Sequence, residues 1–132
     1  MRPISVQIMT FHRDAGLRRA VRSVIAQRGV DPASIEILVV DNSAEGSARQ
    51  VAAGLAELAE ASGFRLRYVA ETRPGIARAR NAGIQHAGAD LIAYVDDDEE
   101  AEPGWLAAML ATYAGMAAAT ETANGGSGLP GP

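Results

Sequence analysis

The spacing of hydrophobic and polar residues changes repeatedly along the chain. Four short apolar stretches are too short for helices and predict buried strands. The segments between them repeat apolar residues at three- and four-residue steps, which is typical of amphipathic helices. The predicted strands cover residues 4–9, 35–40, 64–69 and 91–95. The predicted helices follow them: one between an N-cap at Asp14 and a terminator at Gly29, and others at about 47–61, 76–87 and 103–116.

Strand and helix alternate throughout, which predicts an α/β fold: a Rossmann-like parallel sheet of about four strands with helices on both faces. Right-handed crossovers in a doubly wound sheet predict the strand order 3-2-1-4. In the third strand arginines alternate with Leu66 and Tyr68, which predicts an edge strand with one solvent face. Small residues fill the third helix and predict its close approach to the sheet.

Ligands of open α/β sheets bind at the carboxyl ends of the strands, where the strand order reverses. We therefore expect the functional residues in three segments that are distant in sequence. These are residues 10–13, 41–43 and 96–98.

The length of 132 residues limits the chain to one domain. We expect this domain to cover residues 1–119 and the Gly- and Pro-rich residues 120–132 to be a disordered tail. The apolar stretch 105–119 is shorter than the ~20 residues that a membrane span needs. With no signal peptide recognised at the N-terminus, we expect a cytoplasmic protein without a transmembrane segment, and a peripheral membrane association stays open.

Composition excludes several classes of function. The formal net charge of -4 disfavours a nucleic-acid partner. The absence of cysteine excludes disulfides and thiolate metal sites. All 12 basic residues are arginine, whose planar guanidinium suits phosphate recognition.

An acidic run follows the last predicted strand. Like charges this close repel one another unless a cation lies among them. Carboxylate oxygens favour Mg²⁺ or Mn²⁺, and Mg²⁺ typically binds one or two carboxylates together with substrate phosphates. A solvated acidic loop would have the same composition, but the position at a strand's carboxyl end favours a metal site. The run consists of Asp96, Asp97, Asp98, Glu99 and Glu100.

Other nucleotide and metal motifs are missing. The first strand is followed by Thr-Phe-His-Arg at residues 10–13, where a dinucleotide-binding oxidoreductase would carry GxGxxG. The sequence contains no P-loop. The acidic run lacks the alternating ligands and central glycine of an EF-hand.

Four segments, taken in order, resemble the motifs of family 2 glycosyltransferases with a GT-A fold. In that family they correspond to the Thr-aromatic-Asn-Arg end of strand one, the Asp that ends strand two, the helix with Gly and Ala-Arg-Asn, and the Asp-x-Asp metal motif followed by Pro. They extend over nearly all of residues 4–110. The segments are IMTFHR (8–13), EILVVDNS (36–43), PGIARARNAGI (74–84) and LIAYVDDDEEAEPGWL (91–106).

The resemblance implies a role for individual residues. Asp96 and Asp98 correspond to the acids that bind Mn²⁺ or Mg²⁺, and Asp41 corresponds to the aspartate that contacts the base. The remaining residues expected in the nucleotide pocket are Phe11, Arg13, Gly75 and Asp97. A purely structural role for Asp41 stays open, because strands often end in Asp for reasons of turn formation.

Further residues leave alternatives open. Thr10 is expected only to shape the turn. Arg73, Arg78 and Arg80 either reach phosphate or are solvated or paired with acidic residues. His12 stands where the family has Asn, and we assign it no proton-transfer role, because a lone loop histidine is more often structural.

The resemblance implies an inverting, metal-dependent glycosyltransferase that moves a sugar from a nucleotide-diphosphate donor to an acceptor hydroxyl, in polysaccharide or glycoconjugate synthesis. Family members carry an acceptor-binding half and an acidic general base after the metal motif. Here only Glu121 follows the predicted helices, so the base is unidentified. The alternative is a catalytically incomplete nucleotide-sugar or cation-binding module, or a truncated remnant. A missing half also predicts self-association or a covering partner.

Overall fold

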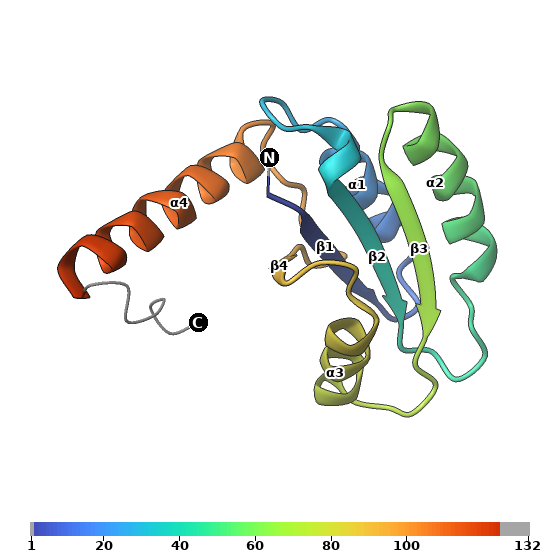
Figure 1. The fold of residues 1–132 in the computed structure, drawn as a ribbon. Coiled ribbons are helices and arrows are strands. Elements are labelled where there is room, and N and C mark those ends of the chain that lie inside the picture. Colours follow the sequence, from blue (N-terminus) through green and yellow to red (C-terminus); the bar gives the residue numbers. More distant parts are fainter. Residues whose placement is uncertain (1, 125–132) are drawn as a thin grey trace.

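The structure, a computed structural model, describes residues 2–124, with side chains described as far as residue 114 (Figure 1). Four strands and four α-helices alternate along this part of the chain, and a short 3₁₀ turn at Pro32–Ser34 precedes the second strand. The elements are β1 (Ile4–Thr10), α1 (Asp14–Ile25), β2 (Ile35–Asp41), α2 (Arg49–Ala61), β3 (Arg65–Ala70), α3 (Ile76–His86), β4 (Leu91–Tyr94) and α4 (Trp105–Asn124).

The strands form one parallel sheet in the order β3-β2-β1-β4, which confirms the predicted order. Thr10 pairs with Asp41, and Asp41 pairs with Ala70, so β1, β2 and β3 end at the same level. β3 lies at one edge, as the alternation of its residues predicts. The two ends of the sheet therefore differ, and the carboxyl end brings three loops together.

Helices cover both faces of the sheet, with α1 and α2 on one side and α3 on the other (Figure 1). The larger core joins the sheet to α1 and α2 and includes Ile8, Leu17, Ile37 and Leu55. A smaller core lies under α3 and consists of Leu38, Val40, Ala79 and Ala82. All seven residues of β2 are buried, as expected for a central strand covered on both faces.

Polar side chains are buried beneath α3, beside the smaller core. Glu36 accepts hydrogen bonds from Ser5 Oγ (3.0 Å) and the Gly88 N–H (2.8 Å), and it pairs with Arg67. Gln7 Nε2 donates to the Gly83 carbonyl oxygen at 2.8 Å. These bonds fix α3 against the sheet, and the small residues of the helix allow the close approach that the sequence predicts.

Every predicted strand matches an observed strand to within one residue at each end. The first and last helices differ from the prediction at both ends. Asp14 is the first residue of α1 and not its N-cap, since Arg13 holds that position without a side-chain bond. α1 ends at Ile25, because Arg28 turns away to donate its N–H to the Pro103 carbonyl oxygen (2.7 Å).

The last helix differs most from expectation. It begins at Trp105, after a turn that contains Pro103, and ends at Asn124 instead of near Met116. Residues 105–124 contain no proline and many alanines, so the helix continues where a glycine-rich tail was expected to begin. Residues 120–124 thus belong to α4, while the rest of the predicted tail, 125–132, lies outside the described residues. Among the described helices, none has the length and apolar character required to cross a bilayer.

Candidate nucleotide and metal site

A cavity of about 380 Å³ opens at the carboxyl end of the sheet, between β1, β4 and the start of α3. It is the place where the strand order reverses, as predicted. Residues from four separate segments line it. They are Met9, Thr10, Phe11, Arg13, Asn42, Ile76, Ala79, Arg80, Asp96, Asp97 and Asp98.

The end of β1 contributes one wall of the cavity. Thr10 is buried, and its Oγ1 has no hydrogen-bond partner among the described residues. Phe11 is 59% exposed, although an aromatic ring of this size is usually covered. Across the cavity Ile76, in the first turn of α3, is 68% exposed. Phe11 and Ile76 thus present uncovered apolar side chains to the cavity from two sides, whereas the Thr10 hydroxyl is enclosed.

His12 supports this wall from outside the cavity. Its backbone is in the left-handed region, with φ of 53°, which is uncommon for a residue other than glycine. Its ring meets Phe11 edge-on at 4.5 Å between centroids, and its Nε2 lies 3.1 Å from Glu45 Oε1. The contacts indicate that His12 orients Phe11.

The acidic run forms the opposite wall. Asp96, Asp97 and Asp98 all line the cavity, and a turn fixes the first of them: the Glu99 N–H donates to the Asp96 carbonyl oxygen (3.0 Å) and Glu99 Oε1 accepts from the Asp96 N–H (3.1 Å). Partial desolvation and the charges of Glu99, Asp98 and Asp97 raise the pKa of Asp96. Burial is the largest cause of this shift, and the neighbouring carboxylates add to it.

The acidic residues at the cavity fit a cation whose coordination is completed by a bound ligand. Among the described residues, no group of three or more His, Cys, Asp or Glu side chains is arranged to hold a metal by itself. Mg²⁺ usually needs only one or two carboxylates, because substrate phosphates and water complete its coordination. Asp96 and Asp98 offer such a pair of hard oxygen donors at the cavity.

Asp41 is not among the residues that line the cavity. Its side chain is fully buried, and its oxygens accept hydrogen bonds from Tyr68 Oη (2.6 Å), the Ala48 N–H (2.9 Å) and the Ser43 N–H (3.0 Å). Burial raises the pKa of Asp41, but the bonds from Tyr68, Ser43 and Ala48 outweigh it and lower the pKa overall. The structure thus favours the structural alternative, in which Asp41 joins β2 to β3 and α2.

Asn42 lines the cavity and is the member of the expected segment 41–43 that does so. Its Nδ2 donates to the carbonyl oxygens of Glu71 and Arg73, both at 2.8 Å, and its Oδ1 accepts from the Gly75 N–H at 3.2 Å. Gly75 has a φ of 121°, which suits glycine, and it sets the start of α3 beside the cavity without lining it. The signal for Asn42 was present: successive residues of a strand point in opposite directions, so a buried Asp41 turns Asn42 outward.

The arginines divide into two groups. Arg13 and Arg80 line the cavity, and the Arg80 guanidinium lies 5.8 Å from the centre of the Tyr94 ring. Arg73 instead pairs with Glu71 at 2.6 Å, which lowers the pKa of that carboxyl to about 2. Arg78 is not among the lining residues. Of the three arginines whose role was open, Arg80 is the one that lines the cavity.

A comparison with known families now identifies the chain. The sequence model described as glycosyl transferase family 2 matches residues 5–120. This chain belongs to glycosyl transferase family 2. The match confirms the resemblance seen in the four motifs.

Curated family relatives are considerably longer than this chain. Succinoglycan biosynthesis protein ExoM of Rhizobium meliloti (strain 1021) is 32% identical over 109 residues, which are 83% of this chain and 34% of ExoM. Validoxylamine A glucosyltransferase of Streptomyces hygroscopicus subsp. limoneus is 32% identical over 118 residues, which are 88% of this chain and 25% of that protein. The chain thus spans a quarter to a third of these relatives.

Solved structures show that the fold is the GT-A fold of glycosyltransferases. S. aureus TarS 1–349 in complex with UDP aligns with a TM-score of 0.72 at 17% identity, covering 86% of this chain and 32% of that 1–349 chain. Mannosyltransferase PcManGT from Pyrobaculum calidifontis, in complex with GDP-Man and Mn²⁺, aligns with a TM-score of 0.66 at 22% identity, covering 76% of this chain and 29% of that protein. Our chain corresponds to one part of the fold.

Proposed function

We propose that this chain is the donor-binding part of a glycosyltransferase and that its cavity binds a nucleotide-diphosphate sugar. The observation that carries the proposal is the cavity itself, which gathers the end of β1, Asn42, the start of α3 and three aspartates. The neighbouring structures that hold UDP, or GDP-Man with Mn²⁺, support this ligand class.

The base and ribose would lie against the apolar wall. Phe11 and Ile76 present exposed apolar surface for a planar ring. Asn42 lines the cavity beside this surface. Both of its amide hydrogens are bonded to carbonyl oxygens, but its Oδ1, which accepts one hydrogen bond from the Gly75 N–H, keeps a second lone pair that can accept from the polar edge of a base. We therefore assign base contact to Asn42 in place of Asp41.

The diphosphate would lie between the arginines and the acidic run. Arg13 and Arg80 bring positive charge to the cavity, and the guanidinium group forms paired hydrogen bonds with phosphate oxygens. Asp96 and Asp98 would hold Mn²⁺ or Mg²⁺, and Asp97 would lie on the nucleotide side. When bound, such a cation neutralises negative charge on a departing diphosphate.

Sugar transfer needs one group more than these residues provide. The acceptor hydroxyl attacks the anomeric carbon, the bond from that carbon to the diphosphate oxygen breaks, and a base takes the hydroxyl proton. No described residue is assigned as this base, and the Glu121 side chain lies outside the described side chains. A relative named for succinoglycan biosynthesis supports polysaccharide or glycoconjugate as the product class.

The chain's short span favours a second candidate, a module that binds the nucleotide sugar without turnover. It covers 34% of ExoM and 25% of validoxylamine A glucosyltransferase. If the acceptor half and the base lie outside this span, binding and catalysis separate in the isolated chain. Turnover therefore distinguishes the two candidates.

Calorimetric titration tests the proposal. UDP and GDP are titrated into the chain with and without Mn²⁺, alongside Asp98→Ala and the control Asp90→Ala, which removes an equal charge remote from the cavity. We expect Asp98→Ala to weaken Mn²⁺-dependent binding by about tenfold or more, about 1.4 kcal/mol, and Asp90→Ala to leave it unchanged.

The outcomes separate the candidates. Hydrolysis or transfer of a donor sugar in the presence of Mn²⁺ would establish the enzyme, and nucleotide binding without turnover would establish the module. Failure of the unaltered chain to bind either nucleotide with Mn²⁺ would refute both.

We further propose that another copy of the chain covers β4 and α4 when the chain is alone. Among the described strands β4 pairs only with β1, so its outer edge carries free backbone groups. α4 extends away from the sheet (Figure 1), and a hollow of about 500 Å³ lies between its first turns and β4. Tyr94, Trp105 and Met109 line this hollow and give it an apolar side.

A further inference from the structure

Helix α1 contacts the segment of the acidic run at both of its ends. At the first turn, a Cβ atom added to Gly16 would lie 2.1 Å from the Asp97 carbonyl oxygen. The backbone of Asp97 therefore rests directly on the backbone of α1, and no residue larger than glycine fits between them. At the other end, the side chains of Ser23, in the last turn, and Gln27, two residues beyond the helix, hold the residues that follow the acids.

Gln27 is the central residue of the second contact. Its side chain is buried, its Nε2 donates to the Glu102 carbonyl oxygen at 2.7 Å, and its Oε1 accepts from the Leu106 N–H at 3.0 Å. Ser23 Oγ accepts from the Ala101 N–H at 2.9 Å. The Gln27 side-chain amide thus bonds both to the Glu102 carbonyl oxygen before α4 and to the Leu106 N–H in the first turn of α4.

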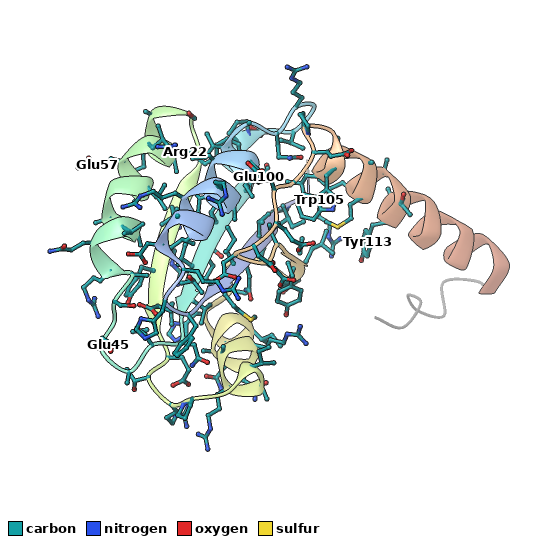
Figure 2. The ribbon with its side chains drawn as sticks, turned by 180° about the vertical axis from the view of Figure 1, so that it is seen from behind. Arg22, Glu45, Glu57, Glu100, Trp105 and Tyr113 are labelled. Carbon is teal, nitrogen blue, oxygen red and sulfur yellow. The ribbon has the colours of Figure 1, made fainter. Side chains whose placement is uncertain are left out.

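The acidic run has few other means of holding its shape. Residues 95–104 lie between β4 and α4 and belong to neither. Within the run, the described hydrogen bonds are those between Asp96 and Glu99, while the five carboxylates repel one another. Figure 2 shows Glu100 and Trp105 on the stretch that passes alongside α1 into α4. An external template is therefore needed to keep these carboxylates at the cavity.

We propose that Gly16 and Gln27 are positioning residues for the carboxylates of Asp96 and Asp98. Gly16, in α1, and Gln27, just after it, hold the segment 96–106 at two points. Asp96 and Asp98 therefore face the cavity before any ligand binds. The expected change in Mn²⁺-dependent affinity rests on the proposed function. The expected conformational order of residues 96–106 does not depend on it. Neither residue lines the cavity. Gln27 is remote from the cavity, so its substitution should act on metal-dependent binding through the acidic run; Gly16 lies in an adjoining hollow beside Asp97 and Asp98.

Hydrogen exchange of the ligand-free chain tests the template itself. Gln27→Met keeps the side-chain length and removes the hydrogen bonds to Glu102 and Leu106, together with one to the Ser23 carbonyl oxygen. Gln7→Met makes the same change at a buried glutamine that bonds to α3 instead. We expect peptides covering residues 96–106 to exchange about tenfold faster in Gln27→Met and to be unchanged in Gln7→Met. Equal exchange of this segment in Gln27→Met and the unaltered chain would overturn the proposal.

Nucleotide affinity tests the consequence for the site. UDP is titrated with and without Mn²⁺ into Gln27→Met, Gly16→Ala and the control Gly54→Ala, a helical glycine whose added Cβ would meet nothing within 4 Å. We expect the first two to lose about fivefold or more of the affinity gained from Mn²⁺ while Mn²⁺-free affinity stays constant. A merely structural role would lower both affinities together.

The two experiments fail in different ways. If the unaltered chain binds neither UDP nor GDP in the presence of Mn²⁺, the proposed function is refuted, and the exchange experiment alone judges the template. If the unaltered chain gains affinity and both variants gain as much, the positioning role is refuted while the proposed function stands.

Discussion

At the scale of single residues, Asp41 and Asn42 show how neighbouring polar side chains take opposite roles. Asp41 is buried and fully bonded within the protein, whereas Asn42 reaches the cavity. A carboxylate that accepts hydrogen bonds from a tyrosine and two backbone N–H groups is stabilised in its ionised form. Asp41 therefore contributes to stability, and its contribution depends on pH.

The hydrogen bond from Tyr68 to Asp41 should be measurable in the unfolding free energy. Because the pKa of Asp41 is lowered in the folded state, its contribution is present above the unfolded value of ~3.9 and is lost as pH falls through the folded pKa. Tyr68→Phe should cost about 1.5–3 kcal/mol at neutral pH, since the bond is to a charged group. Urea unfolding from neutral to acid pH measures both effects.

The pH profile of this variant provides the control. Loss of the Tyr68 bond raises the folded pKa of Asp41, so the variant should begin to lose stability at a higher pH than the unaltered chain, and the difference should shrink in acid. An equal deficit at every pH would contradict the assignment of the effect to the Asp41 carboxylate.

At the scale of elements, the contact of α3 with the sheet depends on Gly83. A Cβ atom at this position would lie 2.2 Å from Gln7 Oε1. Gly83→Ala should therefore destabilise the fold by about 1–3 kcal/mol through overpacking, despite the better helix propensity of alanine. Gly54→Ala, on the open face of α2, should instead stabilise by about 0.5–1 kcal/mol.

Chemical denaturation of both variants shows whether overpacking against Gln7 or the helix propensity of alanine determines the change in stability at position 83. If Gly83→Ala and Gly54→Ala shifted stability equally, the close approach of α3 to Gln7 would be refuted. The comparison is internal to one protein and one type of substitution, so differences in the unfolded state largely cancel.

The elements also show what sequence can predict. The strands and their order follow from short apolar runs that alternate with amphipathic segments, because these patterns fix which surfaces must be buried. The end of α1 was missed because a tertiary contact follows it, the bond from the Arg28 N–H to the Pro103 carbonyl oxygen. Gln27 was missed for the same reason: its partner Glu102 lies 75 positions away. The end of α4 was missed because the Gly- and Pro-rich composition of residues 120–132 outweighed the alanines of residues 117–119 in the prediction.

The candidate site was predictable in part. Phe11, Arg13 and the three aspartates were expected at the strand ends, and the structure gathers them in one cavity. Ile76 was not expected there, because a single apolar residue in a helix pattern predicts burial and not exposure. Its exposure depends on how the preceding turn at Gly75 directs the first turn of α3.

At the scale of the whole molecule, the uncovered edge of β4 and the apolar α4 should make the isolated chain associate with itself. Size-exclusion chromatography with light scattering, over a range of concentrations, should show species larger than 13.7 kDa. Ala108→Arg places a charge at the exposed rim of the hollow beside α4 and should restore the monomer.

A chemically matched change elsewhere controls this prediction. Ala53→Arg introduces the same charge on the exposed face of α2 and should leave association unchanged. A compact monomer for the unaltered chain at high concentration would refute the self-association.

The central claim is that a cation and a nucleotide bind together at Asp96, Asp97 and Asp98. Paramagnetic broadening of NMR signals by Mn²⁺ tests this claim most directly. In amide-resolved NMR spectra with UDP and trace Mn²⁺, we predict selective broadening of signals from Phe11, Ile76 and residues 96–98. Signals from Ile35 and Gly88, at the other end of the sheet, should stay sharp. Broadening that is uniform over the chain, or that spares residues 96–98, would contradict the account.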